Sequence, residues 1–150
     1  MRTKSAIFFE CKVRYEREVE NGLNKKVTET YVVDALSFTE AEGRIVEEMR
    51  PYIGKSEMEV TAIKIASYKE AFFSDADNDD KFYKIRCNFI TLDEKSGKEK
   101  KIAVDYLVQA ASVELARKNL EEVMSETMID YTIVSVIETS IIDLFECKNV

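Results

Sequence analysis

A tandem repeat is the feature that most constrains how this chain can fold. Residues 31–49 read YVVDALSFTEAEGRIVEEM and residues 106–124 read YLVQAASVELARKNLEEVM, so adding 75 to each number superimposes the two segments. Both segments run from an apolar strand through a serine into an amphipathic helix. The strand-like stretches at 9–15 and 83–89 also correspond, at an offset of 74. We therefore expect one supersecondary unit that occurs twice.

Alternation of side chains predicts the strands of the first repeat. Residues 9–15 and 27–35 alternate between apolar and polar side chains, which is typical of half-buried strands. Asn21-Gly22 between them is a strong hairpin signal, because both residues tolerate positive φ. A third strand is expected over 58–67, and residues 68–73 are expected to continue it.

One helix is predicted in each repeat. Ser37 fits the N-cap position, and Glu40, three residues later, completes a capping box. Pro51 and Gly54 are expected to stop this helix. Ser112 takes the same N-cap position in the second repeat. Apolar residues at helical spacing predict that each helix packs one side against the strands.

We predict an α+β fold built by tandem duplication of a β-β-α-β unit. Antiparallel sheets, with one helix per repeat packed on one face, are expected to be related by a pseudo-twofold axis. The crossover through the helix returns the third strand parallel to the second, and the first strand pairs between them. One continuous sheet and two packed sheets both stay open. The expected single domain consists of two repeats (about 6–73 and 81–146) joined by an acidic loop at 74–80, and strands at 133–137 and 141–145 close the second repeat.

The composition is that of a globular domain. The 150 residues are 45% hydrophobic and 34% charged, which suffices for a buried core. No apolar run reaches the roughly 20 residues that a membrane helix needs, and the N-terminal segment does not resemble a secretory signal. Cys11, Cys87 and Cys147 are an odd set without CxxC spacing, which indicates reduced thiols. We therefore expect a cytoplasmic protein with no membrane partner.

Charge and residue types disfavour several functions. The formal net charge is −7, whereas nucleic-acid binders usually carry a basic excess that neutralises phosphates. The chain has no histidine, which removes the commonest general base and metal ligand. Its four glycines are too well separated to build a phosphate-binding loop. We expect no enzymatic activity, no catalytic residues, no metal site and no cofactor.

The acidic loop offers one candidate metal site. Asp75, Asp77 and Asp79 have the opening spacing of an EF-hand loop. Asp80 stands where that loop needs glycine, and Arg86 stands where it needs a bidentate glutamate. We therefore interpret the segment as a solvated loop between the repeats, with a weak adventitious Ca²⁺ or Mg²⁺ site as the alternative.

Basic residues are the most informative candidate site. Four of them should project from the solvent face of the two equivalent first strands, and two follow the hairpin turns. If the pseudo-twofold brings these strands together, a basic stripe results that could hold single-stranded nucleic acid, a nucleotide or an acidic protein surface. Interleaved acidic residues partly neutralise this stripe. The candidate contacts for an anion or nucleic acid are Lys12, Arg14, Lys26, Lys84, Arg86 and Lys101.

Several phrases of the sequence resemble one family. They include KVRYE, NGLNKKVTE, FITLDEKSGKEKK and IDYTIVSVIETSIIDLF. They are similar to an uncharacterised family of short proteins from Bacteroides-group gut bacteria and their crAss-like phages, over nearly the whole chain. The resemblance implies the cytoplasm of a bacterial host and a phage or mobile-element connection. It implies no activity and no site residues.

The favoured hypothesis is a non-enzymatic intracellular accessory or adaptor protein that acts through protein–protein interaction. The alternative is nucleic-acid or nucleotide binding through the basic stripe, for which a steep salt dependence would be diagnostic. A third hypothesis is sequestration of a small anionic ligand between repeats or subunits, which requires a concave pocket lined by both repeats. The oligomeric state and the identity of any partner stay open.

Overall fold

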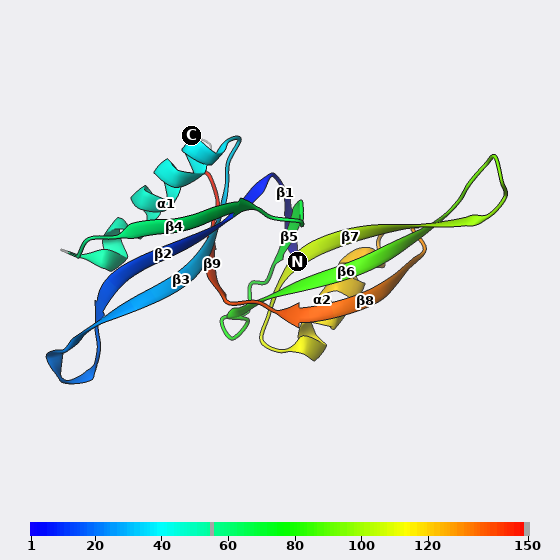
Figure 1. Ribbon diagram of the computed structural model, residues 1–150. Helices are drawn as coiled ribbons and strands as arrows, with labels where there is room; N and C mark the ends of the chain where they lie inside the picture. The colour runs from blue at the N-terminus through cyan, green and yellow to red at the C-terminus, as the bar shows by residue number, and fades with distance from the viewer. Residues whose placement is uncertain (55, 149–150) are drawn as a thin grey trace. The chain divides into compact units, whose positions relative to one another are not determined.

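The computed structural model describes residues 1–54 and 56–148, and its helices and strands recur along the chain (Figure 1). An N-terminal strand and the first repeat contain β1 (Arg2–Ser5), β2 (Phe8–Glu18), the 3₁₀ turn η1 (Glu20–Gly22), β3 (Asn24–Asp34), α1 (Phe38–Ile53), β4 (Glu59–Ile65) and β5 (Glu70–Phe73). The second repeat contains β6 (Lys81–Leu92), β7 (Glu99–Ala110), α2 (Val113–Met124), β8 (Tyr131–Glu138) and β9 (Ile141–Phe145). Each repeat is thus β-β-α-β followed by one further short strand.

Within the described residues, the strands form two sheets rather than one. The five-stranded sheet has the order β1-β5-β7-β6-β8, and the four-stranded sheet has the order β4-β2-β3-β9. Because β2 pairs antiparallel with both β3 and β4, these two neighbours run parallel to each other on either side of it. This is the predicted crossover arrangement. The α+β class, with one helix in each half, is confirmed.

The short last strand of each repeat pairs with the other repeat. β5 pairs in parallel with β7, and β9 pairs in parallel with β3. Two compact units result, and each contains chain from both repeats. The five-stranded unit comprises Met1–Ser5 and Ser67–Thr139, and the four-stranded unit comprises Ala6–Ala66 and the chain from Ser140 onward.

This exchange departs from two expectations. The sheets are mixed rather than purely antiparallel, because the returning short strands run parallel to their neighbours. Residues 68–73 do not continue the third strand, since β4 ends at Ile65 and β5 joins the other sheet, where Phe72 is buried. The polar sequence RTKS also gives no signal for β1, because its strand conformation depends on pairing with β5.

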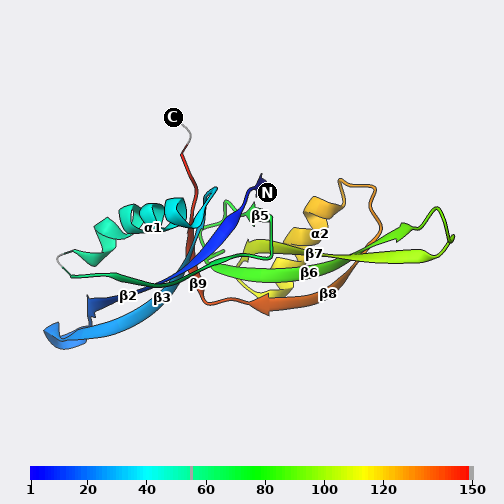
Figure 2. The ribbon, with the colours of Figure 1, turned by 45° about the horizontal axis from the view of Figure 1, so that its top comes forward.

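Each helix packs its apolar side on one face of the sheet in its own unit (Figure 2). The strand positions predicted to face inward, such as Phe9 and Tyr83, are buried against these helices. In the described part of the chain, no helix is long and apolar enough to span a membrane. The buried helix positions correspond at an offset of 75 and are Ala41, Ile45 and Met49 in α1 and Ala116, Leu120 and Met124 in α2.

The helix N-termini are capped as predicted. The Ser37 hydroxyl accepts a hydrogen bond from the Glu40 backbone N–H at 3.1 Å, and Ser112 caps α2 in the same way. The Glu40 carboxylate accepts from the Leu36 N–H at 3.1 Å, one residue before the expected capping-box donor. Pro51 does not stop α1 but lies in its last turn, and the helix ends before Gly54, whose φ of 58° favours glycine.

A β-bulge occurs at the same place in both repeats. The pairing of β2 with β4 shifts register at Thr61, and the pairing of β6 with β8 shifts register at Val134. These residues lie 73 positions apart. The same offset relates Ala66 to Thr139, and the backbone N–H of each donates to the carbonyl of an equivalent phenylalanine. The two edge strands β4 and β8 are therefore equivalent residue by residue.

Candidate interaction surfaces

The six predicted basic residues lie on four strands. In the four-stranded unit, β2 carries Lys12 and Arg14, and β3 carries Lys26. The other three, Lys84 and Arg86 of β6 and Lys101 of β7, belong to the five-stranded unit. All are exposed except Lys84, which is half-buried. A single stripe joining β2 and β6 concerns the relation between the two units and stays a prediction.

Arg86 is held by a carboxylate across the strand pair. Its Nε donates to Asp105 Oδ1 at 2.9 Å, and the Ser67 hydroxyl donates to Oδ2 of the same carboxylate at 2.6 Å. The Asp105 side chain is only 5% exposed, whereas that of Arg86 is 50% exposed. The hydrogen bond from Arg86 holds the pKa of Asp105 below its usual range. Arg86 is therefore a structural partner of Asp105, which makes it a weaker ligand for an external anion.

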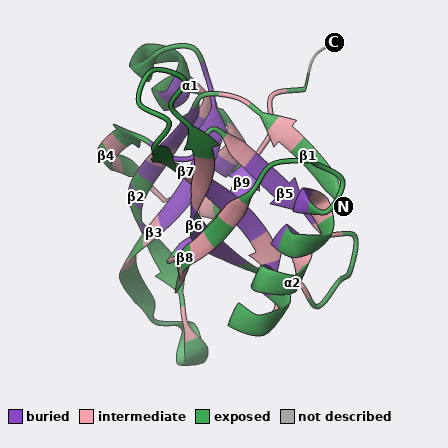
Figure 3. Ribbon diagram, turned by 90° about the vertical axis from the view of Figure 1, so that its right-hand side faces the viewer, coloured by how far each residue is buried: buried purple, intermediate pink, exposed green. Residues whose placement is uncertain are grey.

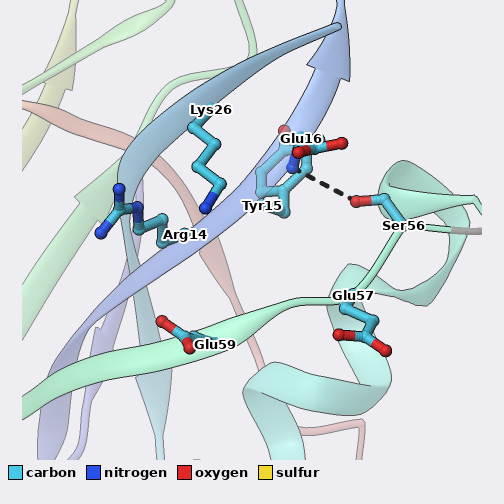
Figure 4. A pocket seen from close by; sticks show the side chains of 7 residues that line it. All are labelled: Arg14, Tyr15, Glu16, Lys26, Ser56, Glu57 and Glu59. Atoms are coloured by element: carbon cyan, nitrogen blue, oxygen red, sulfur yellow. Dashed lines mark hydrogen bonds between the residues drawn. The ribbon is translucent and has the colours of Figure 1, made fainter.

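Arg14 and Lys26 share a shallow groove of about 490 Å³ in the four-stranded unit (Figure 4). Three carboxylates line the same groove and outnumber the two cations. Glu59, the first residue of β4, lies opposite Arg14 in the strand register. The groove is completed by Tyr15, Glu16, Ser56 and Glu57. Its mixed charge does not favour an anionic ligand, and Lys12 lies outside it.

The most distinctive surface is the free edge of β8. One side of β8 pairs with β6, and its other side has no neighbouring strand in the described part of the chain. No charged residue occurs in Tyr131–Ile137, and Glu138 at the end of the strand pairs with Lys81 at 3.7 Å. We call Tyr131–Glu138 the β8 edge. The burial colouring shows it without a fully buried residue (Figure 3).

The three other edge strands of the two sheets carry charges within their lengths. These charges are Arg2 and Lys4 in β1, Glu59 and Lys64 in β4, and Asp143 in β9. Charged side chains on an edge strand oppose pairing with another chain. The β8 edge lacks this protection over seven consecutive residues.

A groove of about 540 Å³ runs beside the β8 edge. One wall is the flank of α2, formed by Val113, Arg117 and Glu121, and the floor is residues 131–136 of β8. The α2 flank carries an i,i+4 ion pair at 3.0 Å between Arg117 and Glu121. We call this the α2–β8 groove. Val113 and Val134 are both about half exposed, so the groove combines apolar surface with an unpaired backbone edge.

Two equivalent polar clamps hold the exchanged strands, and sequence reasoning missed both. In the four-stranded unit, Asp34 at the end of β3 accepts hydrogen bonds from Arg44 and from the Cys147 backbone N–H. At the equivalent position of the five-stranded unit, Gln109 accepts from the Ser74 backbone N–H at 3.0 Å. The sequence carries a signal for these contacts, because Asp34 and Gln109 are polar residues at the ends of apolar strands and lie 75 positions apart.

Burial lowers the reactivity of two of the free cysteines. It raises the pKa of the Cys11 and Cys87 thiols to about 11. Cys147 is half-buried.

In the acidic loop, the Ser74 hydroxyl is hydrogen-bonded to the Asp79 carboxylate. No cluster of three or more potential metal-ligating side chains occurs among residues 1–54 and 56–148.

The family model described as a domain of unknown function, DUF4494, matches residues 7–147. The chain belongs to the DUF4494 family. The match covers nearly the whole chain, as the sequence resemblance to an uncharacterised family implied. No curated protein and no solved structure gives a significant match. Membership of DUF4494 assigns no residue a role, so the surfaces described above carry the functional argument.

Proposed function

We propose that this DUF4494 protein is a non-enzymatic accessory or adaptor protein that binds another protein chain through the β8 edge and the α2–β8 groove. The observation that carries the proposal is the uncharged, unpaired edge of β8 beside a partly apolar groove. An exposed strand edge presents a row of backbone N–H and C=O groups that can pair with an added strand. Side chains of that strand would enter the adjacent groove and provide specificity.

The duplication provides an internal comparison for this proposal. β4 occupies the same position in the four-stranded sheet and has the same bulge, yet it carries Glu59 and Lys64. The equivalent β8 residues, at an offset of 73, are Thr132 and Ile137. Two repeats with the same backbone therefore differ in whether their edge strand is protected by charge. A protein-binding role for one edge accounts for this difference.

A non-enzymatic role is supported by the state of the potential reactive groups. The Cys11 and Cys87 thiols are buried and have raised pKa values, which disfavours the nucleophilic thiolate. Asp105 is occupied by Arg86 and Ser67, so its carboxylate is not a free general base. The chain has no histidine that could take this role.

The cellular setting forms part of the proposal. The resemblance of the sequence phrases to proteins of Bacteroides-group bacteria and their phages supports a phage or mobile-element factor in the cytoplasm of a bacterial host. In that setting a partner would be a component of the host or of the phage. Reduced cysteines agree with a cytoplasmic protein.

Affinity capture from a Bacteroides lysate tests the proposed surface. The baits are the wild-type chain, Val134→Lys in the β8 edge, and Thr61→Lys at the equivalent bulge of β4. We expect proteins retained by wild type and Thr61→Lys to be lost with Val134→Lys, because a charge opposes strand addition. Equal retention by all three baits would overturn the proposal that the β8 edge binds the partner.

Nucleic-acid binding is the second candidate. It is favoured by one observation: the structure records no ion pair for Lys12, Arg14, Lys26, Lys84 or Lys101 among the described residues. Fluorescence polarisation with labelled single-stranded DNA and RNA tests it at low and physiological salt. A nucleic-acid binder should lose affinity steeply as salt rises, and a Lys12/Lys84/Lys101 triple alanine variant should lose binding. No polarisation change even at low salt would eliminate this candidate.

A further inference from the structure

We propose that the β8 edge pairs antiparallel with the β8 edge of a second copy of this chain, so that two five-stranded sheets become continuous. The inference rests on the proposed function, because it names the protein chain that occupies this edge. A twofold axis perpendicular to the sheet relates the two copies, which makes the contact isologous. The α2 helices then lie on the same face of the joined sheet.

The β8 edge is chemically suited to pair with itself. Its sequence YTIVSVIE is rich in β-branched and aromatic residues, which favour strand structure and cross-strand packing. Two charged edges of the same sequence would place like charges near each other, whereas Tyr131–Ile137 has none. Val134 and Ile137 are 53% and 51% exposed, so their burial against a second copy would remove apolar surface from water.

The bulge at Val134 fixes the register of this pairing. In a regular strand alternate residues share a face, but the extra residue shifts the alternation by one. Cross-strand partners on β6 identify the two faces of β8, because opposing residues lie on the same face. The positions on the α2 face are Tyr131, Ile133, Val136 and Glu138, and those on the opposite face are Thr132, Ser135 and Ile137.

A twofold axis at the bulge keeps the opposing pairs on either side of the bulge on one face. Ile133 then lies opposite Val136 of the second copy, with both on the α2 face and packed on the core. Thr132 lies opposite Ile137 of the second copy, with both on the other face. A shift of the register by one residue would place inward residues opposite outward ones, which a continuous sheet does not allow.

Each end of the β8 edge meets an ion pair of the second copy in this register. Glu138 of one copy lies opposite Tyr131 of the other, on the α2 face. Arg117 lines the α2–β8 groove beside Tyr131 but is paired with Glu121 at 3.0 Å, so the incoming Glu138 carboxylate would have to compete with Glu121 for this guanidinium. The ends of the interface therefore add little to the pairing, which rests on the uncharged residues 131–137 and on the register set by the bulge.

The association state of the full chain tests the pairing. In sedimentation-velocity ultracentrifugation over roughly 1 to 100 µM, we expect wild type to associate from the 17.3 kDa monomer to a species of twice that mass. Val134→Lys should weaken the dimer by at least about tenfold in Kd, because the substitution occurs twice across the axis. Thr61→Lys is the matched control and should associate as wild type does. Circular dichroism establishes that both variants fold.

The register is tested by cysteine cross-linking. Under mild oxidation, the Thr132→Cys/Ile137→Cys variant should form covalent dimers through opposing residues of the two copies. The Ser135→Cys/Ile137→Cys variant places no two introduced thiols opposite each other and should cross-link no more than wild type. Equal cross-linking of the two variants would overturn the proposed register.

The outcomes separate this inference from the proposed function. A monomeric wild type, or a dimer insensitive to Val134→Lys, overturns self-pairing. If such a chain still loses its captured lysate proteins with Val134→Lys, the proposed function stands and its partner is a different protein. If Val134→Lys changes neither association nor capture, both are overturned.

Discussion

The backbone N–H of Cys147 donates a 2.7 Å hydrogen bond to the carboxylate of Asp34, more than a hundred residues earlier in the chain. The same carboxylate pairs with Arg44, whose guanidinium also donates to the Phe145 carbonyl at 3.2 Å. Phe145 in turn stacks on Tyr31 with a ring-centroid distance of 5.4 Å. Polar and aromatic contacts therefore fix β9 of the second repeat beside β3 of the first.

Asp34→Ala should destabilise the protein by about 2–4 kcal/mol, because it removes the carboxylate that accepts from a backbone N–H and neutralises a largely buried guanidinium. Gln109→Ala is the matched control in the five-stranded unit, where only a neutral hydrogen bond to Ser74 is lost, and should cost about 1 kcal/mol. Urea unfolding monitored by circular dichroism measures both values. If both variants lose the same free energy of unfolding, the Asp34–Arg44 ion pair does not strengthen the contact between β3 and β9.

Stability should fall as the pH rises from about 9 to 11. Burial raises the pKa of the Cys11 and Cys87 thiols from 9.0 to about 11 in the folded protein. A raised folded pKa means that the unfolded state loses its protons first, so the stabilisation is complete below pH 9 and is lost above it. Each thiol should contribute roughly 1–2 kcal/mol to this decline.

Cysteine variants isolate this contribution. In Cys11→Ala and Cys87→Ala the free energy of unfolding should be lower at pH 8, since a buried side chain is truncated. The slope between pH 9 and 11 should nevertheless be shallower than in wild type. If the free energy of unfolding of Cys11→Ala and Cys87→Ala falls with pH as steeply as that of wild type, the buried thiols do not cause the loss of stability.

Asp105 should stabilise the fold above pH 4 and cease to do so in acid. Arg86 holds its folded pKa below the ordinary value of 3.8, so the unfolded state takes up the proton first as the pH falls. The stabilisation is therefore present at neutral pH and is lost as the pH falls through the folded pKa. Asp105→Asn should unfold more easily than wild type at pH 7, and the difference should shrink towards pH 2. Thermal melts from pH 2 to 7 measure this convergence; a constant difference would contradict it.

The two halves of the chain should fold only together. Each compact unit contains chain from both repeats, so a fragment ending at Asp77 lacks β9 and a fragment starting at Asn78 lacks β1 and β5. We expect neither fragment alone to show a cooperative unfolding transition as a monomer, and the mixture to regain one. Calorimetry of each fragment and of the equimolar mixture checks this. A monomeric first fragment with a sharp transition would contradict the importance of the exchanged strands.

Local pattern accounts for most of the secondary structure. Alternation predicts β2 and β6, and the serine caps at Ser37 and Ser112 predict the helix starts. The turn at Asn21-Gly22 also agrees, since both residues have positive φ. These features depend on contacts between near neighbours, which a sequence displays directly.

Pairing between distant segments was not predictable in the same way. β5 and β9 are short apolar strands whose sequences do not state which sheet they join, and the choice depends on free edges formed elsewhere in the chain. The pairing of Arg86 with Asp105 had a signal, because extending the hairpin register back from Gly97 places them opposite each other. The β8 edge became recognisable only when the sheet order left it unpaired.

The reciprocal placement of β5 and β9 also bears on synthesis by the ribosome. The four-stranded sheet needs β9, which is translated only after β6, β7, α2 and β8 of the second repeat. Until then the edge of β3 is open and its apolar residues lack their final cover. The nascent first repeat therefore stays an incomplete sheet until β9 is translated, and in that interval it is open to chaperones or to β9 strands of neighbouring nascent chains on the same message.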